Sequence, residues 1–99
     1  MTTNTDANRV ILSGKLSKIE IGLTAQNFPF ANIIITSIGL KYTENVPCVV
    51  YGDTVSHVRE LAVGDSIMVQ GRLRVKEAKD RDGNDRAFIT MVISRIKKQ

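Results

Sequence analysis

The segment "DTVSHVRELAVGD" (Asp53 to Asp65) interrupts a chain whose other apolar segments have the pattern of β-strands. Aspartate is a favourable N-cap residue, so Asp53 is expected to begin a helix. The apolar residues that follow have the spacing of one helical face: Val55, Val58, Leu61 and Ala62. Gly64 lies where a helix stops. The segment therefore predicts a helix of about three turns over residues 53–62.

Three strands are predicted before this helix. Residues 9–21 alternate between apolar and polar side chains around Gly14, and a glycine inside a strand marks a bulge or a sharp bend. Residues 31–40 are rich in β-branched side chains and follow Pro29, which is expected to lie outside the strand ladder. Residues 46–52 form a third, shorter segment.

Two strands are predicted after the helix, joined by a long hairpin with the turn "DGND" at residues 82–85. Residues 66–76 alternate, so one face of this strand carries Ile67, Val69, Gly71, Leu73 and Val75. The other face carries Met68, Gln70, Arg72, Arg74 and Lys76. Residues 86–96 are apolar on both faces, which predicts cover on both sides, including cover by a partner chain.

Three strands, a helix and two strands is the order of an OB-fold, an all-β five-stranded Greek-key barrel with one helix between strands 3 and 4. A β-sandwich more often has seven strands and no helix. Residues 9–96 are predicted to form this OB-fold domain, and the polar residues 1–8 are predicted to form a disordered lead.

Length and composition limit the possible classes. The 99 residues fit one domain, and no apolar run approaches the ~18 residues that cross a membrane. Cys48 is the single cysteine, which excludes an internal disulfide and agrees with a cytoplasmic location. The net charge of +4 and the pI of 9.5 favour a polyanionic partner such as nucleic acid.

The long hairpin holds many of the cations. Arg72, Arg74 and Lys76 lie on the polar face of its stem, where they would extend an electrostatic path for a phosphate backbone. The acidic residues near the tip dilute the positive field: Glu77, Asp80, Asp82 and Asp85. The alternative is that these cations form an ordinary solvated strand face.

Five successive segments resemble the motifs of the bacterial single-stranded DNA-binding protein family, over about residues 8–94: "NRVILSGKL", "ANIIITS", "VVYGD", "VGDSIMVQGRLR" and "DRDGNDR". The resemblance implies an OB-fold that binds single-stranded DNA without reading its sequence, in DNA replication, recombination or repair. It also implies a homodimer or homotetramer in which residues 9–16 of two subunits pair, and other replication proteins as partners.

The resemblance also implies roles for individual side chains. Phosphates are expected to contact Lys15, Lys18, Arg72, Arg74, Lys76, Lys79, Arg81 and Arg86. Bases are expected to stack on Tyr51 and Phe88. This chain contains no tryptophan. The positions that match the tryptophans common in the family are near Lys41, Asn45 and Ala78. Binding is therefore expected to depend on cations and to be sensitive to salt. Phe28 and Phe30 are expected to be core or loop anchors.

The sequence lacks the glycine- and glutamine-rich linker and the acidic tip of the family. It is therefore similar to short, tail-less members, and a relation to primosomal replication protein N, a dimeric accessory of replication restart, is one alternative. A second alternative is an OB-fold protein-interaction module, in which Met68 and either Val92 or Ile96 would face a protein partner.

Catalysis is not expected. His57 is the single histidine, and one histidine with one cysteine cannot form a zinc cluster. The segment "DRDGND" departs from a calcium loop, because Asp85 stands where that loop needs glycine. The sequence also has no phosphate-binding or dinucleotide-binding fingerprint. We therefore expect no enzyme activity, no cofactor and no metal.

Overall fold

The computed structural model describes residues 7–39 and 41–99. Its elements are β1 (Val10–Leu23), β2 (Pro29–Ile38), β3 (Thr43–Tyr51), a 3₁₀ turn η1 (Gly52–Thr54), α1 (Val55–Val58), β4 (Ser66–Lys79) and β5 (Asp85–Lys98). The predicted order of strands and helix is confirmed, and the strand ends differ from the predicted ones by a few residues. Pro29 begins β2 and lies opposite Leu23, so it belongs to the ladder.

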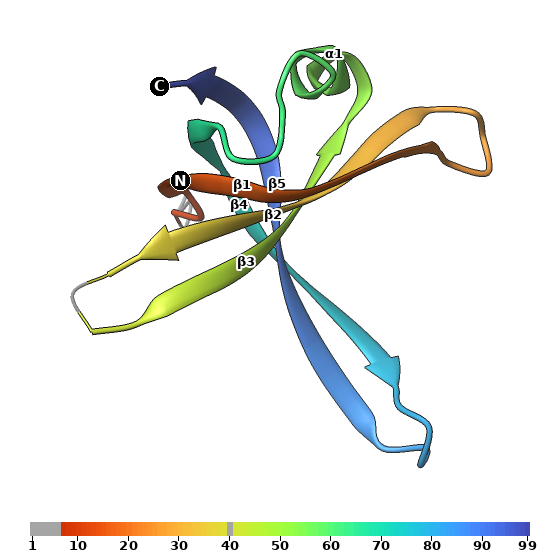
Figure 1. Cartoon of the computed structure of the whole chain (residues 1–99). Helices are drawn as coiled ribbons and strands as arrows, with labels where there is room; N and C mark the ends of the chain where they lie inside the picture. The colour runs from red at the N-terminus through yellow and green to blue at the C-terminus, as the bar shows by residue number, and fades with distance from the viewer. Residues whose placement is uncertain (1–6, 40) are drawn as a thin grey trace, which may run out of the picture.

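The strands form a closed barrel in the order β1-β2-β3-β5-β4, which confirms the OB-fold (Figure 1). Four of the five contacts between strands are antiparallel. The fifth is parallel and short, and joins Cys48, Val49 and Val50 of β3 to Met91, Val92 and Ile93 of β5. This ladder closes the barrel.

Strand β1 changes its partner near Gly14. Its first half pairs with β4 as far as Lys15, and its second half pairs with β2 from Lys15 onward. A Cβ on Gly14 would collide with the backbone carbonyl of Thr36, so only glycine allows this close approach. The register shifts between Leu16 and Lys18, so the bend lies at the glycine and the irregularity lies just after it.

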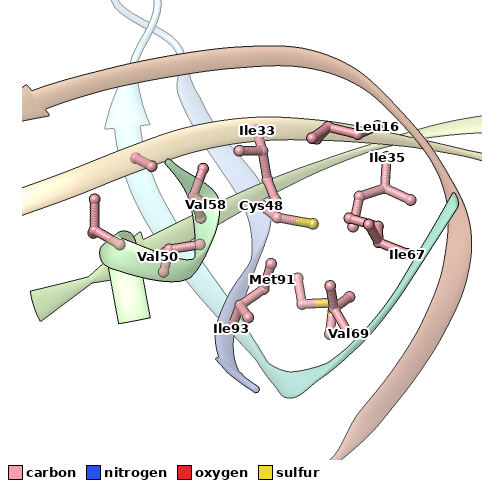
Figure 2. Close-up of a cluster of buried hydrophobic side chains, with 12 residues drawn as sticks. Leu16, Ile33, Ile35, Cys48, Val50, Val58, Ile67, Val69, Met91 and Ile93 are labelled. Carbon is pink, nitrogen blue, oxygen red and sulfur yellow. The ribbon is translucent and has the colours of Figure 1, made fainter. Parts of the chain in front are cut away.

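The core lies inside the barrel and receives side chains from every strand and from α1 (Figure 2). Its largest fully buried side chains are Leu16, Ile33, Ile35, Ile67, Met91, Val50, Val55, Val58 and Val69. Burying one such side chain stabilises the fold by about 1.5–3 kcal/mol relative to leaving it exposed. The helix closes one end of the barrel through Val55 and Val58.

The predicted helix over residues 53–62 is wrong in length. The α-helix has only four residues, and its N-cap residue Thr54 makes no side-chain capping bond, so Asp53 is not the cap. The α-helical ladder ends early because the amides of Glu60 and Leu61 bond to the carbonyls three residues back, those of His57 and Val58, at 3.2 and 3.0 Å. The amide of Ala62 then bonds to the Asp65 carboxylate at 2.9 Å. Asp65 therefore turns the chain towards β4, and Ala62 stays exposed.

The β4–β5 hairpin extends well away from the barrel as the cyan and blue ribbon in Figure 1. The radius of gyration is 15.1 Å, above the ~13 Å of a compact chain of this length. Leu73, Val75 and Ile89, which share one face of the hairpin, are 43%, 61% and 59% exposed. Within this chain β5 is therefore not covered on both sides as the sequence predicted.

Most of the predicted disordered lead, residues 1–6, lies outside the described residues. Asn8, the last part of the predicted lead that the structure describes, is bound to the hairpin. Its side-chain amide donates to the carbonyl of Leu73 at 2.8 Å and accepts from the Leu73 amide at 2.9 Å. In the described residues, no helix has the length and apolar character needed to cross a membrane.

Cys48 is 2% exposed and contributes to the core. Burial disfavours the thiolate, and it raises the pKa of the Cys48 thiol from 9.0 to about 12. The thiol therefore stays protonated in the folded protein at neutral pH, which makes it a packing residue and not a nucleophile.

We expect this burial to lower stability at alkaline pH. Because the folded pKa is raised, the contribution of Cys48 is complete below pH 9 and is lost as the pH rises towards about 12. The free energy of unfolding should fall above pH 9 by up to about 1.4 kcal/mol per pH unit more in the wild type than in Cys48→Val. Urea unfolding of both proteins between pH 8 and pH 10.5 measures this difference, and parallel pH curves would contradict it.

Candidate nucleic-acid interface

The strand register places several cations on one face of the long hairpin. Residues directly opposite each other in an antiparallel pair share a face. Three cations of β4 occupy positions directly opposite residues of β5, in the pairs Arg72–Val92, Arg74–Thr90 and Lys76–Phe88. We call the surface made by these six residues, with Ala78 and Arg86, the hairpin face.

Strand β3 extends the hairpin face onto the barrel. Val49 lies beside Val92 in the parallel ladder, so Tyr51, two residues further along β3, points to the same side. Tyr51 is opposite Phe30 of β2, and its side chain is 41% exposed. The ring of Phe30 packs over Gly22, 3.1 Å from the position that a Cβ there would take. Two aromatic residues thus occupy opposite positions of β2 and β3 at the base of the hairpin.

Tyr51 and Arg74 form one unit. The Nη1 atom of Arg74 donates a hydrogen bond to the Tyr51 hydroxyl at 3.1 Å, and the guanidinium carbon lies 5.7 Å from the ring centroid. This cation–π arrangement holds the tyrosine side chain beside a positive charge. A guanidinium has five N–H donors, so the bond to Tyr51 leaves other donors for a phosphate.

Phe88 is the aromatic residue of the hairpin face itself. It is 51% exposed and lies opposite Lys76. From the barrel outward, the face therefore presents Tyr51 with Arg74 and then Phe88 with Lys76. A groove that alternates cations with exposed rings is the arrangement that single-stranded nucleic acid binds, because phosphates and bases are contacted in turn.

The two lysines of β1 lie outside this cluster. Lys18 is exposed opposite Ile34 of β2, on the same side of the sheet as Phe30. Its partner Ile34 is four residues from Phe30 along β2, a distance of about 13 Å at the usual strand rise. Lys15 lies at the place where β1 changes partners, opposite both Thr36 and Ser66. These lysines flank the aromatic pair but do not join it.

Arg86 stabilises the hairpin tip. Its Nε atom bonds to Asp80 Oδ2 at 2.8 Å, while Asp80 Oδ1 accepts the amides of Asp82 and Asn84, both at 2.9 Å. The Arg86 guanidinium, assisted by these amides, lowers the pKa of the Asp80 carboxyl. The charge of Arg86 is therefore partly neutralised within the turn, while Arg81 is exposed at the tip.

Lys79 lies away from the hairpin face. Lys79 is three residues from Lys76, an odd number, so its side chain lies on the opposite face of β4. It is opposite Asp85, and its Nζ atom is 3.6 Å from the Asp85 carboxylate. The pair belongs to the face that carries Val75 and Ile89. Of the eight cations predicted to contact phosphates, four lie on the hairpin face: Arg72, Arg74, Lys76 and Arg86. Arg86 is bound to Asp80, so the other three are the ones without a carboxylate partner among the described ion pairs.

Phe30 is expected from the sequence to be a core or loop anchor, but it lies on β2 opposite Tyr51. The signal for this position was the alternation of β2, because Ala31 and Ile33 are core residues and Phe30 must then face outward. Which residue of β3 lies opposite Phe30 depends on the strand register, and the alternation of β2 does not give that register.

Chemistry other than binding finds little support in the described residues. Across residues 7–39 and 41–99, no group of three His, Cys, Asp or Glu side chains is placed to hold a metal ion. His57 is exposed on α1, and Cys48 is buried in the core. The surface that stands out is the basic, aromatic hairpin face.

Comparisons with known proteins give a family and a fold for the chain. The model of the Single-strand binding protein family matches residues 7–99. A single-stranded DNA-binding protein of Saccharomyces cerevisiae mitochondria, Rim1, superposes with a TM-score of 0.82 at 14% identity, covering 95% of this chain and 96% of Rim1. The SSB of Plasmodium falciparum, solved in complex with ssDNA, superposes with a TM-score of 0.83 at 16% identity, covering 99% of each chain. A search of curated proteins finds no match.

We predict that Asp80 titrates below its ordinary value of 3.8, because Arg86 and two amides stabilise the carboxylate. The order of the tip is then present above pH 3.8 and is lost as the pH falls through the lowered pKa. NMR titration of the Asp82 and Asn84 amide signals measures this midpoint. Arg86→Gln should move the midpoint towards 3.8, and Lys79→Gln is the matched control. A wild-type midpoint at or above 3.8 would contradict the role given to Arg86.

Proposed function

The chain belongs to the Single-strand binding protein family, and we propose that it binds single-stranded DNA without reading its sequence. The observation that supports this proposal most directly is the hairpin face. There, Arg72, Arg74 and Lys76 alternate with the exposed rings of Tyr51 and Phe88. Cations contact the phosphates that every nucleotide has, and rings stack on the π-face that every base has.

The same arrangement explains a preference for single strands. In a duplex the base faces are stacked on one another and are unavailable to Tyr51 or Phe88. Only the phosphates remain, and these give weak binding that is sensitive to salt. A single strand offers both groups, so the exposed rings add affinity for it that a duplex cannot obtain.

We assign different weights to the cations. Arg72, Arg74 and Lys76 form the main phosphate path, and Lys15 and Lys18 extend it over β1 and β2. Arg81 lies at the tip, where a long strand can reach it. Arg86 and Lys79 contribute less, because each is paired with a carboxylate, at 2.8 Å and 3.6 Å respectively. Phe30 joins Tyr51 as a second ring at the base of the hairpin.

A homodimer fits the edge of β1. In its first half β1 pairs with β4 on one side, and its described pairing with β2 begins only at Lys15. The second edge of residues 10–14 is therefore open for another strand, and an open edge readily accepts one. Pairing of two β1 strands would give the oligomer. The cytoplasmic location and the part in replication, recombination or repair belong to the same proposal.

A protein-interaction role is the second candidate, because the reverse side of the hairpin is apolar and exposed. Leu73, Val75 and Ile89 lie there together. Burial of apolar surface depends little on salt, whereas release of counterions from phosphates depends on it steeply. Salt dependence therefore separates the two functions.

We predict that fluorescence anisotropy of a labelled dT strand of ~35 nucleotides detects binding that weakens steeply with salt, and that the matching duplex binds far less. Arg72→Ala combined with Arg74→Ala should make the plot of log K against log salt shallower by roughly 1.4, about 0.7 for each lost phosphate contact. Arg59→Ala combined with Lys98→Ala is the control, because it removes the same charge from exposed residues outside the proposed phosphate path. No binding of the wild type at low salt would overturn the proposed function.

Tyr51 provides a separate test of stacking. Tyr51→Leu should weaken binding of the same dT strand by ~1–3 kcal/mol, because one base loses its aromatic platform. Tyr51→Phe keeps the ring and should retain most of this energy, although it removes the hydroxyl that accepts from Arg74. Equal affinities of the leucine variant and the wild type would show that the cations act without this ring.

A further inference from the structure

A row of polar side chains crosses the outward face of the first three strands. Lys15 of β1 lies opposite Thr36 of β2, and Thr36 lies opposite Asn45 of β3. Along both β2 and β3, this row is an even number of residues from the Phe30–Tyr51 pair. The row therefore points to the same side of the sheet as that aromatic pair. This is the side on which Lys15 extends the proposed phosphate path.

The proton of the Thr36 hydroxyl has two acceptors within reach. The Thr36 oxygen lies 2.8 Å from Asn45 Oδ1 and 3.1 Å from Ser17 Oγ. The proton of Ser17 is already used, because its hydroxyl donates to the carbonyl of Ile34 at 3.0 Å, and a carbonyl can only accept. Since a hydroxyl has one proton, Thr36 donates either to Asn45 or to Ser17 at any one time.

This choice gives the Asn45 amide two orientations. When Thr36 donates to Oδ1, the Nδ2 group is turned away from Thr36 and offers N–H donors. When Thr36 donates to Ser17, its oxygen can accept a bond from Nδ2, and Oδ1 is turned away as an acceptor. The amide stays bound to Thr36 in both orientations. Because Asn45 is exposed, its outer group is available to a ligand as a donor in one orientation and as an acceptor in the other.

The surroundings of this amide suit a nucleotide. A hollow of about 270 Å³ adjoins Thr36 and is also bordered by Lys15 and Ile38. Lys15 is exposed and offers a positive charge to a phosphate. Ile38 is 77% exposed and offers an apolar surface to the face of a base. A nucleotide in this hollow would have the polar edge of its base near the side chains bound to Thr36.

We propose that the Asn45 amide is a reversible contact to base edges. It donates to an acceptor such as thymine O4, and after turning over it accepts from a donor such as the N4 amino group of cytosine. This inference rests on the proposed function and deepens it, because such a contact adds a hydrogen bond without reading sequence. A side chain of fixed polarity would favour the bases that present the complementary group. The Thr36 hydroxyl removes this preference by holding the amide in either orientation.

A cross-strand contact that only stabilises the sheet is the alternative role for Asn45. The two roles differ in what they require. A structural contact acts in the free protein and affects every ligand equally, whereas the proposed contact acts only when a base is present. Strands with and without bases therefore separate the two roles.

The first test compares a dT strand, a dC strand and an abasic deoxyribose-phosphate strand, each of ~35 nucleotides. Asn45→Ala should weaken binding of dT and of dC by a similar factor, roughly threefold for one lost hydrogen bond, and leave the abasic strand unchanged. Gln26→Ala is the matched control, because it removes an exposed amide at the turn between β1 and β2. Equal dT affinities of Asn45→Ala and Gln26→Ala would overturn the inference, and so would equal weakening of all three strands by Asn45→Ala.

The second test fixes the polarity of the amide. Ser17→Ala removes the acceptor that competes for the Thr36 proton, so Thr36 donates to Asn45 Oδ1 and the Nδ2 donors stay outward. The ratio of dT affinity to dC affinity should then rise roughly threefold above the wild-type ratio. The rise should vanish when Asn45→Ala is added, because Ser17 acts through the amide. A ratio that does not change in Ser17→Ala contradicts the two orientations.

The outcomes also separate this inference from the proposed function. Failure of the wild type to bind any of the strands at low salt would overturn the proposed function itself. The wild type may instead bind dT and lose affinity through Arg72→Ala with Arg74→Ala, while Asn45→Ala matches its control. In that case the phosphate path stands and only the role of Asn45 is overturned.

Discussion

The parallel contact between β3 and β5 is the constraint on which the rest of the structure depends. It joins only Cys48, Val49 and Val50 to Met91, Val92 and Ile93, yet it turns a curved sheet into a closed barrel. Closure buries Cys48 against Met91 and Ile93 in the core. Because the contact begins at Met91, the earlier part of β5 has β4 as its neighbour and must leave the barrel with it. The projecting hairpin is thus a direct consequence of how short this ladder is.

The projection gives β4 two environments along one strand. Near its start, Ile67 and Val69 fill the core, and their neighbours Met68 and Gln70 face outward. Beyond Gly71 the alternation continues, but there is no core to face, so Val75 is exposed. The outward row of β4 keeps one orientation along the whole strand. It starts at Met68 on the barrel and ends at Lys76 on the hairpin, so one surface continues from the barrel to the hairpin.

Much of this arrangement could be predicted from the sequence, and the parts that could not depend on register. The order of elements and the alternation of residues 66–76 were correct because period and turn residues are local signals. The predicted helix was too long because Glu60 and Leu61 bond to carbonyls three residues back and the Asp65 carboxylate takes the amide of Ala62, contacts that helix propensity does not include. Lys79 was grouped with Lys76 although the same alternation puts it on the reverse side. The contact between Arg74 and Tyr51 joins residues 23 apart in sequence, so only the closed barrel reveals it.

That contact changes how the aromatic and basic parts of the surface should be understood. A chain without tryptophan has few rings on which bases can stack, and one of these rings is bound to one of the main cations. Residues in direct contact have effects that do not add, so removing Tyr51 also releases Arg74, and removing Arg74 also releases Tyr51. In the proposed function, stacking and charge neutralisation are therefore coupled at the base of the hairpin, whereas at Phe88 and Lys76 no such bond joins the two side chains among the described contacts. Because Tyr51 and Arg74 are in direct contact, a substitution of either residue acts on both parts of the proposed binding at once.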